Sequence, residues 1–325
     1  MTTRACVTGA AGFIGFHLAR TLAAEPDTHV TAVDNHLRGA DDAAWRALAS
    51  RPNVTALRLD LTDPAAVAQL PEDIDELYHL AALNGTQNFY ARPWEVLRNS
   101  TLPTLHLIDR YGPTGRLRRF VYAGSSEVYA STVSRFGWPV PTAEDVPPAI
   151  ADIFNPRWSY ATAKLHGEIA TLHGAAAHGM PATVLRYHNV YGPRMGDAHV
   201  IPDFLERARS GVFALYGAEQ TRAFLHIDDA VRATLLAARH PDTDGALLNL
   251  GGSTEISMHA LARLMMEIAG LTGEIACHPA PPGSVDRRLP DCTRLARITG
   301  FAERVSLREG LAETIADILG PAHAG

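Results

Sequence analysis

The stretch Thr8-Gly9-Ala10-Ala11-Gly12-Phe13-Ile14-Gly15 joins an apolar run, Ala5–Thr8, to a segment with the length and apolar character of a helix, Ile14–Ala24. A glycine-rich turn in this position is typical of folds that bind a dinucleotide. The backbone N–H groups at the start of the helix then face the pyrophosphate. The stretch therefore predicts a first strand, a phosphate-binding turn and a first helix, in that order.

Each glycine of the turn has an expected task. We expect Gly9 to permit the tight turn, Gly12 to permit close approach of the backbone to the pyrophosphate, and Gly15 to permit close packing of the helix on the strand. Phe13 and Ile14 lie between these glycines and are also expected to contact the cofactor. A tight strand-to-helix turn without a ligand is the alternative interpretation.

Residues suited to the adenosine half of a dinucleotide follow. Asp34 ends the second strand candidate about 20 residues after the turn, where a carboxylate holds the ribose 2′-hydroxyl. Its charge repels a 2′-phosphate, so we expect NAD rather than NADP, although nearby Arg38 is able to accommodate such a phosphate. Asn35, and Asp60 with Leu61 near the end of the third strand candidate, are also expected at this end of the cofactor. Asp60 has a plainer alternative, as a residue that starts a turn.

The first half of the chain alternates strand and helix candidates, which is typical of βαβ units and a parallel sheet. We expect an α/β fold, with a Rossmann-type doubly wound parallel sheet and a smaller, interleaved C-terminal substrate domain. The dinucleotide-binding domain is expected to comprise 1–190, with 228–250 returning to it, and the substrate-binding domain 191–227 and 251–325. One strand is expected over Ala182–Val190, and the proline-rich Ser131–Pro156 is expected to be a loop over a site.

The composition excludes several classes of protein. The 325 residues are 46% hydrophobic and 20% charged, which is ordinary for a globular protein, and the net charge of -6 argues against nucleic-acid binding. No apolar run approaches the roughly 18 residues of a membrane span, and no signal-peptide pattern opens the chain. Three widely spaced cysteines agree with a cytoplasmic location. Fifteen histidines without an HExxH or CxxC spacing predict no metal site.

Six motifs, in order along nearly the whole chain, resemble the short-chain dehydrogenase/reductase superfamily. After the G-x-x-G-x-x-G turn, three motifs resemble its H-x-A-A strand end, its serine-bearing strand end and its Y-x-x-x-K pair: His79-Leu80-Ala81-Ala82, Ser125-Ser126-Glu127-Val128-Tyr129 and Tyr160-Ala161-Thr162-Ala163-Lys164. The extended branch, whose members act on nucleotide-sugars, is suggested by three more: the run from Arg186 to Arg194, Gln220-Thr221-Arg222-Ala223-Phe224 with Asp228-Asp229, and Arg287-Arg288-Leu289-Pro290-Asp291.

The resemblance implies chemistry at three residues. Tyr160 and Lys164 are four apart and share one face of a helix. Lys164 and a positive nicotinamide would lower the pKa of Tyr160 and make it a general base for a sugar hydroxyl, while Ser125 would orient that hydroxyl. In this family the carbon oxidised is usually C4, and the ketone is reduced again before product leaves. A surface Tyr–Lys pair is the alternative.

The resemblance also implies binding residues and a partner. The further cofactor contacts are Leu80, Ala81, Ala82, Asn99 and Tyr187, and the contacts to a nucleotide-diphosphate sugar are Ser126, Asn189, Val200, Tyr216, Arg222 and Arg288 or its neighbour Arg287. Family members commonly pair two helices into a four-helix bundle, so we expect a homodimer through Trp94–Tyr111 and Tyr160–His178.

The residue at the position of Glu127 differs between family members that catalyse different reactions. Many 4-epimerases of the family carry a small residue there, 4,6-dehydratases an Asp-Glu pair, and uronic-acid decarboxylases a Ser-Glu pair; this chain has Ser126-Glu127. The missing aspartate weakens dehydration. We prefer a C4 epimerase, with a decarboxylase or dehydratase using Glu127, or a catalytically silent NAD-binding protein, as alternatives. Gly124, Ala130 and Ala223 depart from the family pattern, and Glu127 has a structural alternative as a loop cap or arginine partner.

Overall fold

A computed structural model describes residues 2–320 apart from 198, 212 and 281–283. The chain forms two units. The first comprises Met1–Val128, Asp152–Arg186 and Thr234–Leu248, and the second comprises Tyr129–Ala151, Tyr187–Ala233 and Asn249–Gly325. Compared with the expected ranges, the second unit also takes in the segment after Val128. Among the described residues, no helix is long and apolar enough to cross a bilayer.

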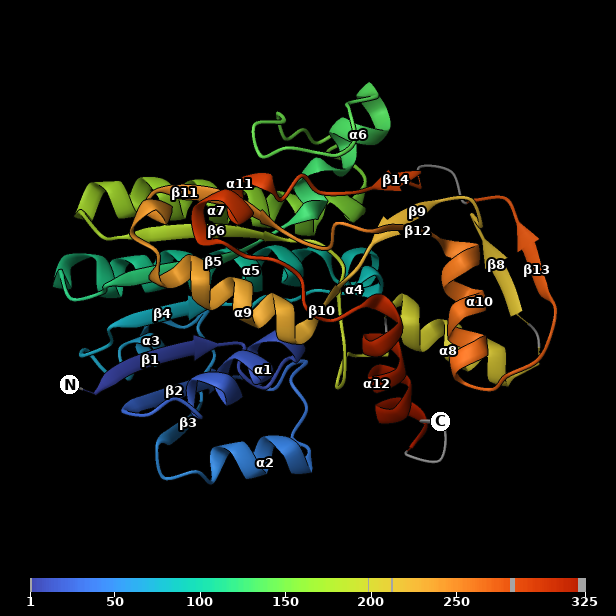
Figure 1. The fold of residues 1–325 in the computed structure, drawn as a ribbon. Coiled ribbons are helices and arrows are strands. Elements are labelled where there is room, and N and C mark those ends of the chain that lie inside the picture. Colours follow the sequence, from blue (N-terminus) through green and yellow to red (C-terminus); the bar gives the residue numbers. More distant parts are fainter. Residues whose placement is uncertain (1, 198, 212, 281–283, 321–325) are drawn as a thin grey trace. The chain divides into compact units, whose positions relative to one another are not determined.

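A seven-stranded sheet in the order β11-β6-β5-β4-β1-β2-β3 forms the centre of the first unit (Figure 1). Its strands β1 to β6 and β11 are Thr3–Thr8, Thr28–Asp34, Val54–Arg58, Glu76–His79, Arg119–Ser125, Ala182–Tyr187 and Ala246–Leu250. The pairings of β1 with β2 and β4, of β2 with β3 and of β4 with β5 are parallel. The expected doubly wound parallel sheet is confirmed. Its order reverses between β1 and β4, where such sheets bind ligands at the carboxyl ends of the strands.

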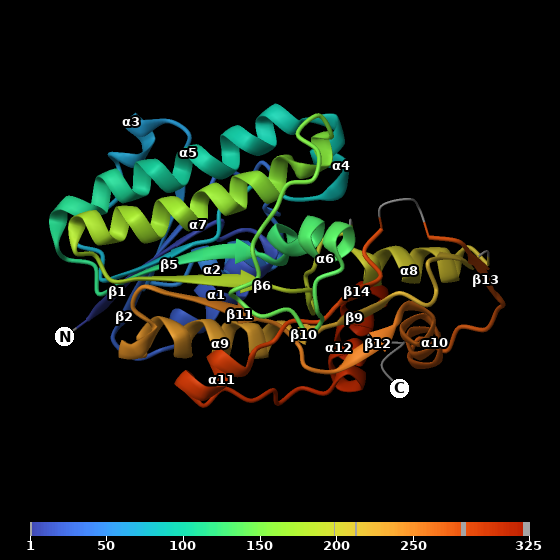
Figure 2. The same ribbon diagram turned by 90° about the horizontal axis from the view of Figure 1, so that it is seen from above.

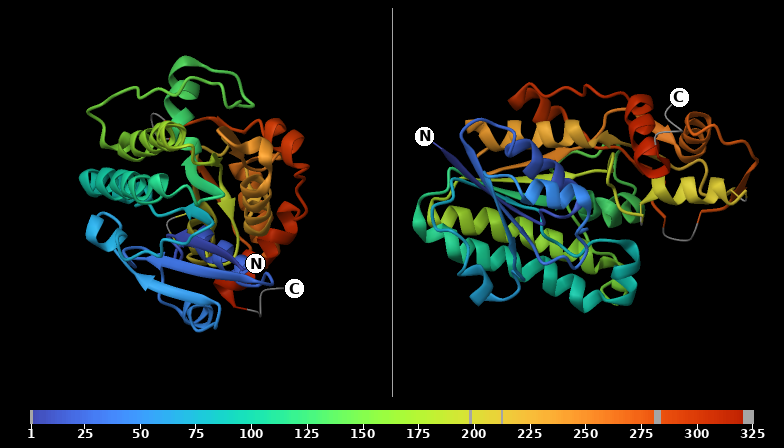
Figure 3. Two further views of the ribbon diagram at one scale, coloured as in Figure 1. Left: turned by 90° about the vertical axis from the view of Figure 1, so that its left-hand side faces the viewer. Right: turned by 90° about the horizontal axis from the view of Figure 1, so that it is seen from below.

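The first unit also contains helices, some of which cover the faces of its sheet. They are α1 Phe13–Leu22, α2 Ala43–Ala49, α3 Pro64–Val67, α4 Thr86–Ala91, α5 Pro93–Tyr111 and α7 Ser159–His178. Helices α5 and α7 lie side by side on one face (Figure 2), and a Cβ at Gly174 would lie 2.7 Å from Ile108, so a glycine allows their close approach. The second half of α9, Ile227–Arg239, covers the other face (Figure 3), where Ala238 O accepts from Arg119 Nε at 2.9 Å.

Short sheets and helices build the second unit. Strand β9, Thr221–Ala223, pairs with β12, Glu255–Ser257, and with β14, Arg287–Arg288. The remaining strands are β7 Val190–Tyr191 with β10 Leu225–His226, and β8 Phe213–Tyr216 with β13 Ile275–His278. The helices are α6 Ala130–Phe136, α8 Val200–Arg209, α10 Met258–Ile268, α11 Thr293–Thr299 and α12 Leu307–Leu319.

Two sequence expectations were wrong here. Part of the expected loop over Ser131–Pro156 is helix α6, because buried Ala130 and Ser131 anchor its first turn and Gly137, at φ 63°, ends it. The expected strand over Ala182–Val190 is two strands, since β6 ends at Tyr187 and β7 pairs elsewhere, with β10.

Candidate active site

The glycine turn after β1 has the geometry that the sequence predicts. Gly9 has φ 72°, and a Cβ there would lie 2.9 Å from the backbone N of Ala81. At Gly15 a Cβ would collide with Gly9 O, and at Gly12, the N-cap of α1, it would lie 3.1 Å from the same atom. Side chains are therefore excluded, and the backbone at the start of α1 stays open to a pyrophosphate, which fits NAD. Phe13 and Ile14 form the first turn of α1.

Asp34 is fixed at the end of β2. Its Oδ2 accepts from Ala11 N at 3.0 Å and its Oδ1 from His36 N at 2.7 Å. A carboxylate has about four acceptor positions, so Asp34 keeps capacity for ribose hydroxyls. Asn35 accepts from Leu37 N within the same turn. Asp60 accepts from Thr62 N and Oγ1, so its alternative role in a turn has direct structural support, and Leu61 is buried.

Hydrogen bonds connect the end of β4 to the end of β1. His79 lies between the hydroxyls of Thr8, at 2.7 Å, and Thr104, at 3.0 Å, and burial lowers the pKa of His79 to about 3. Thr8 Oγ1 also accepts from Ala81 N at 3.2 Å, so a neutral histidine holds the H-x-A-A strand end against the glycine turn. Leu80 and Ala82 flank Ala81. Asn99 lies on α5 and donates to Glu95 O.

The structure brings together the three residues expected to be catalytic. Ser125 ends β5, and Tyr160 and Lys164 lie in the first half of α7. The Ser125 hydroxyl interacts with the Tyr160 hydroxyl and lowers its pKa. Lys164 Nζ donates to Ala123 O at 2.7 Å and lies 5.7 Å from the centre of the Tyr160 ring. Lys164 is also the only lysine in the sequence.

The electrostatics of Tyr160 differ from the expectation. Burial and the nearby Glu127 carboxylate raise the pKa of Tyr160, whereas the Ser125 hydrogen bond and Arg38 lower it. The phenol is nine-tenths buried, so loss of hydration is the largest effect. Lys164 is itself affected, because burial lowers its pKa to about 8 while Glu168 opposes the change. The lowering by nicotinamide stays a prediction.

Behind these residues lies a buried ion pair that was not predicted from the sequence. Arg186 Nε donates to both carboxylate oxygens of Glu168, at 3.0 and 3.1 Å, and Arg186 Nη2 donates to Oε2 at 2.7 Å. Glu168 also accepts from the backbone N of Ser125. A Cβ at Gly124 would lie 2.7 Å from Glu168 Oε1, which explains this departure from the family pattern. Glu168 follows Lys164 by four residues, which makes the two side chains neighbours on one face of a helix. This spacing was a local indication that Glu168 lies close to Lys164.

A second ion pair lies beside Ser125. Glu127 lies in the 3₁₀ turn Ser126–Tyr129, and its backbone N donates to Ser125 Oγ at 3.2 Å. Arg157 lies in the 3₁₀ turn Pro156–Trp158 and donates from Nη2 to Glu127 Oε2 at 3.1 Å. An arginine partner was one expected role of Glu127, but Arg157 was not predicted as that partner. Nothing in the local sequence indicates that the two turns meet.

Three of the expected substrate residues lie around β9 in the second unit. Arg288 of β14 is in register with Arg222 of β9, and Asn189 Nδ2 donates to Ala223 O at 3.0 Å. Arg287 instead forms a paired contact with Glu255, at 2.9 and 2.7 Å, which leaves Arg288 as the arginine beside Arg222.

The other expected substrate and cofactor residues are on separate elements. Tyr216 is 53% exposed in β8 and stacks on His278, with ring centres 5.0 Å apart. Val200 begins α8 and Tyr187 ends β6. Ser126, in the first unit, begins the turn that carries Glu127.

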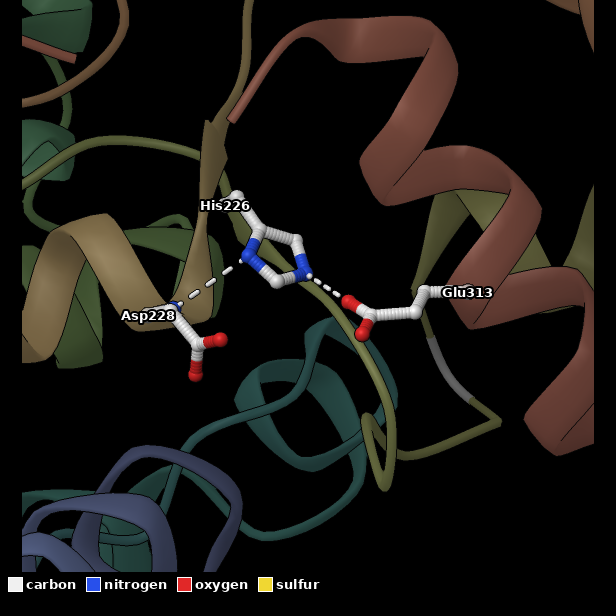
Figure 4. A group of neighbouring side chains, drawn as sticks. All are labelled: His226, Asp228 and Glu313. Atoms are coloured by element: carbon white, nitrogen blue, oxygen red, sulfur yellow. Dashed lines mark hydrogen bonds and ion pairs between the residues drawn. The ribbon is translucent and has the colours of Figure 1, made fainter. Parts of the chain in front are cut away.

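The sequence predicted no metal site. Among the described residues, His226, Asp228 and Glu313 place ligand atoms within 4.8 Å of one another (Figure 4). His226 Nδ1 accepts from Asp228 N at 3.4 Å, which leaves the ring proton on Nε2. Nε2 lies 3.2 Å from Glu313 Oε2, without hydrogen-bond alignment. The three residues therefore form a cluster at the start of α9 in which His226 contacts the backbone of Asp228 and the carboxylate of Glu313.

Comparisons with known proteins agree with this geometry. Residues 5–251 match the model of the NAD dependent epimerase/dehydratase family. A UDP-N-acetyl-alpha-D-glucosaminuronate decarboxylase of Bacillus cytotoxicus is 32% identical, with 97% of each chain covered. A dTDP-glucose 4,6-dehydratase of Streptomyces griseus is also 32% identical, over 97% of this chain and 94% of the relative. The structure of a UDP-glucuronic acid 4-epimerase from Bacillus cereus, with UDP-glucuronic acid and NAD, is similar at a TM-score of 0.86 and 25% identity, over 98% of this chain and 99% of that one. This chain belongs to the NAD-dependent epimerase/dehydratase family.

Proposed function

We propose that the chain oxidises C4 of a nucleotide-linked uronate and then releases C6 as carbon dioxide, with NAD as the cofactor regenerated in place. NAD is the cofactor of the family. The observation that carries the proposal is the Glu127–Arg157 pair beside Ser125. Epimerisation at C4 needs no charged pair at this place, whereas chemistry at C5 and C6 uses one.

The first step belongs to Ser125, Tyr160 and Lys164. When bound, NAD accepts the hydride of C4 and later returns it. Tyr160 Oη takes the proton of the C4 hydroxyl, and the Ser125 hydroxyl, which already interacts with Tyr160, holds the same oxygen. Lys164 is fixed to Ala123 O and supplies positive charge below a pH of about 8.

The 4-ketone makes the uronate a β-keto acid. The bond between C5 and C6 breaks, C6 leaves as carbon dioxide, and the electron pair moves to the C4 oxygen, where the hydroxyls of Ser125 and Tyr160 stabilise the enolate. C5 then takes a proton, and the return of hydride to C4 and of the Tyr160 proton to its oxygen gives a nucleotide-linked pentose. In this proposal Glu127, which lies beside Ser125 and is paired with Arg157, delivers the C5 proton.

Two candidates follow from the relatives. The Bacillus cytotoxicus relative supports decarboxylation of a uronate. The solved Bacillus cereus relative supports C4 epimerisation, the reaction preferred from the sequence, and also acts on a uronate. The aspartate that is replaced by Ser126 weighs against dehydration but not against decarboxylation. Position 126 therefore favours an epimerase over a dehydratase, but it does not favour an epimerase over a decarboxylase.

Mass spectrometry separates the two candidates. Purified protein with NAD is incubated with UDP-glucuronic acid, UDP-N-acetylglucosaminuronic acid and UDP-glucose. Decarboxylation gives a product lighter by the mass of carbon dioxide, and epimerisation gives a product of unchanged mass and altered chromatographic retention. The Tyr160→Phe variant, which keeps the ring but loses the acceptor oxygen, is expected to form neither product. Failure of the wild-type protein to convert any uronate would rule the proposal out.

The homodimer stays a proposal as well. Helices α5 and α7 expose Trp94, Leu105 and Ile169, which a partner would cover. Light scattering at micromolar concentration tests it, and a monomer mass would contradict it. A cytoplasmic location remains a prediction of the sequence.

A further inference from the structure

We propose that Arg157 is the receptor for the C6 carboxylate of the substrate and so makes the site selective for a uronate over the neutral hexose. This inference rests on the proposed function, because only a uronate carries that carboxylate. Neither the motifs nor the conversion of C4 assigns any role to Arg157.

The Arg157 guanidinium is incompletely satisfied. Its side chain is only 20% exposed, yet within the part of the chain that the structure describes it makes one hydrogen bond, to Glu127 Oε2. Its other contact is with the face of Trp158, at 5.2 Å. A guanidinium offers five N–H donors in a planar fork that matches a carboxylate. Arg157 therefore keeps donors for an incoming anion.

The position of Arg157 matches the position of that carboxylate. The side chains of Tyr160 and Ser125 interact, and Ser125 Oγ accepts from Glu127 N at 3.2 Å. Arg157 reaches the Glu127 carboxylate, so a continuous series of contacts leads from the base to the guanidinium. C6 is attached to C5, which is bonded directly to C4. A uronate whose C4 hydroxyl lies at Tyr160 therefore presents its carboxylate close to this pair.

Trp158 restricts the movement of the Arg157 guanidinium. The indole covers one face of the guanidinium, and Asn155 Oδ1 accepts from Arg157 N at 3.0 Å, which fixes the turn. A guanidinium held in place in this way loses less freedom when it binds a carboxylate. Glu127 uses only part of the hydrogen-bonding capacity of Arg157. The remaining donors are able to bind a substrate carboxylate before any existing hydrogen bond has to break.

Binding measurements test this role. The Tyr160→Phe background prevents turnover, and isothermal titration with saturating NAD gives the affinities for UDP-glucuronic acid and UDP-glucose. We expect Arg157→Gln to lower the affinity for UDP-glucuronic acid roughly ten- to a hundredfold, the value of a charge-assisted hydrogen-bonded pair. Affinity for UDP-glucose is expected to change by less than about twofold. Arg157→Lys, which keeps the charge but not the fork, is expected to lie between.

Glu127 provides the decisive control. Removal of Arg157 also leaves the Glu127 charge uncompensated, and that charge alone repels a uronate. The double variant Arg157→Gln/Glu127→Gln removes the repulsion. If Arg157 binds the carboxylate, the double variant still lacks the uronate preference; a restored preference would show that Arg157 only neutralises Glu127 and would overturn the inference. Arg46→Gln, which breaks an exposed pair with Asp41, is the matched control and is expected to change neither affinity.

The remaining outcomes are also decisive. A uronate preference that survives Arg157→Gln, or an equal loss for both ligands, overturns the role of Arg157 while the proposed function stands. A wild-type protein with no preference for the uronate overturns it too. Failure of the proposed function appears separately, as absence of uronate conversion by the wild-type protein in the mass-spectrometric assay.

Discussion

Two arginine–glutamate pairs lie beside the same serine, Ser125, and they differ in burial and in the number of hydrogen bonds that join their partners. The Arg186–Glu168 pair is 4% and 2% exposed and holds three hydrogen bonds between its partners. The Arg157–Glu127 pair is 20% and 18% exposed and holds one. The first, which we call the saturated pair, is deeply buried and joined by several hydrogen bonds, so it supports structure. The second, the unsaturated pair, is more exposed and joined by a single hydrogen bond, which fits the proposed binding of a ligand carboxylate by Arg157.

The largest expected effect comes from breaking the saturated pair. Arg186→Met leaves Glu168 as an unpaired charge in the interior, which costs about 3–5 kcal/mol of unfolding free energy. Denaturant unfolding monitored by circular dichroism measures this loss. The double variant Arg186→Met/Glu168→Leu removes both charges and is expected to recover much of the stability. A loss below about 1 kcal/mol in the single variant would show that the pair is not a structural support.

The next effect is the pH response of Lys164, which lies between Glu168 and Tyr160. Burial lowers the pKa of Lys164 to about 8, so between pH 8 and the unfolded value of about 10.4 the unfolded chain binds more protons. Stability from this group therefore rises with pH across that window, by at most about 1.4 kcal/mol per pH unit. Lys164→Met is expected to abolish the rise.

The single lysine makes this pKa directly measurable. Reductive methylation with ¹³C-formaldehyde labels Lys164 as the only lysine signal, and its chemical shift is followed from pH 6 to 11 by NMR. A midpoint near 8 agrees with burial, and a midpoint above 10 would mean that the ammonium is hydrated. Addition of NAD is a useful second arm, because a bound cofactor changes the surroundings of the amine.

A smaller effect is expected from crowding the saturated pair. Gly124→Ala places a Cβ 2.7 Å from Glu168 Oε1 and 3.2 Å from Leu185 O. Because Arg186 holds the Glu168 carboxylate in place, the clash is not relieved by a simple rotation, and overpacking of this kind costs about 1–3 kcal/mol. Thermal unfolding measures it. The same substitution in the Arg186→Met background is expected to cost less, since Glu168 is then free to move; equal costs in both backgrounds would contradict the explanation.

The two pairs also show which features were predictable from the sequence and which were not. The glycine turn, Asp34 and the Tyr160–Lys164 spacing depend on neighbours in the chain, so local patterns predicted them, and the alternation of strands and helices predicted the sheet. Glu168 and Arg186 lie on a helix and a strand, and Arg157 and Glu127 lie in two turns thirty positions apart. Such contacts are set by tertiary packing, as is the burial that raises the pKa of Tyr160, and no local pattern encodes them.

The smallest expected effect on stability comes from breaking the unsaturated pair. Glu127→Gln removes one charge from a partly exposed contact with a single hydrogen bond, so the unfolding free energy is expected to fall by about 1 kcal/mol or less. Its effect on turnover is different in kind, because a group that delivers a proton contributes about 10²-fold or more to the rate. Denaturant unfolding and product formation from UDP-glucuronic acid are measured on the same preparation. A loss of stability as large as that of Arg186→Met would contradict the distinction between the pairs, and unchanged turnover would remove Glu127 from the reaction.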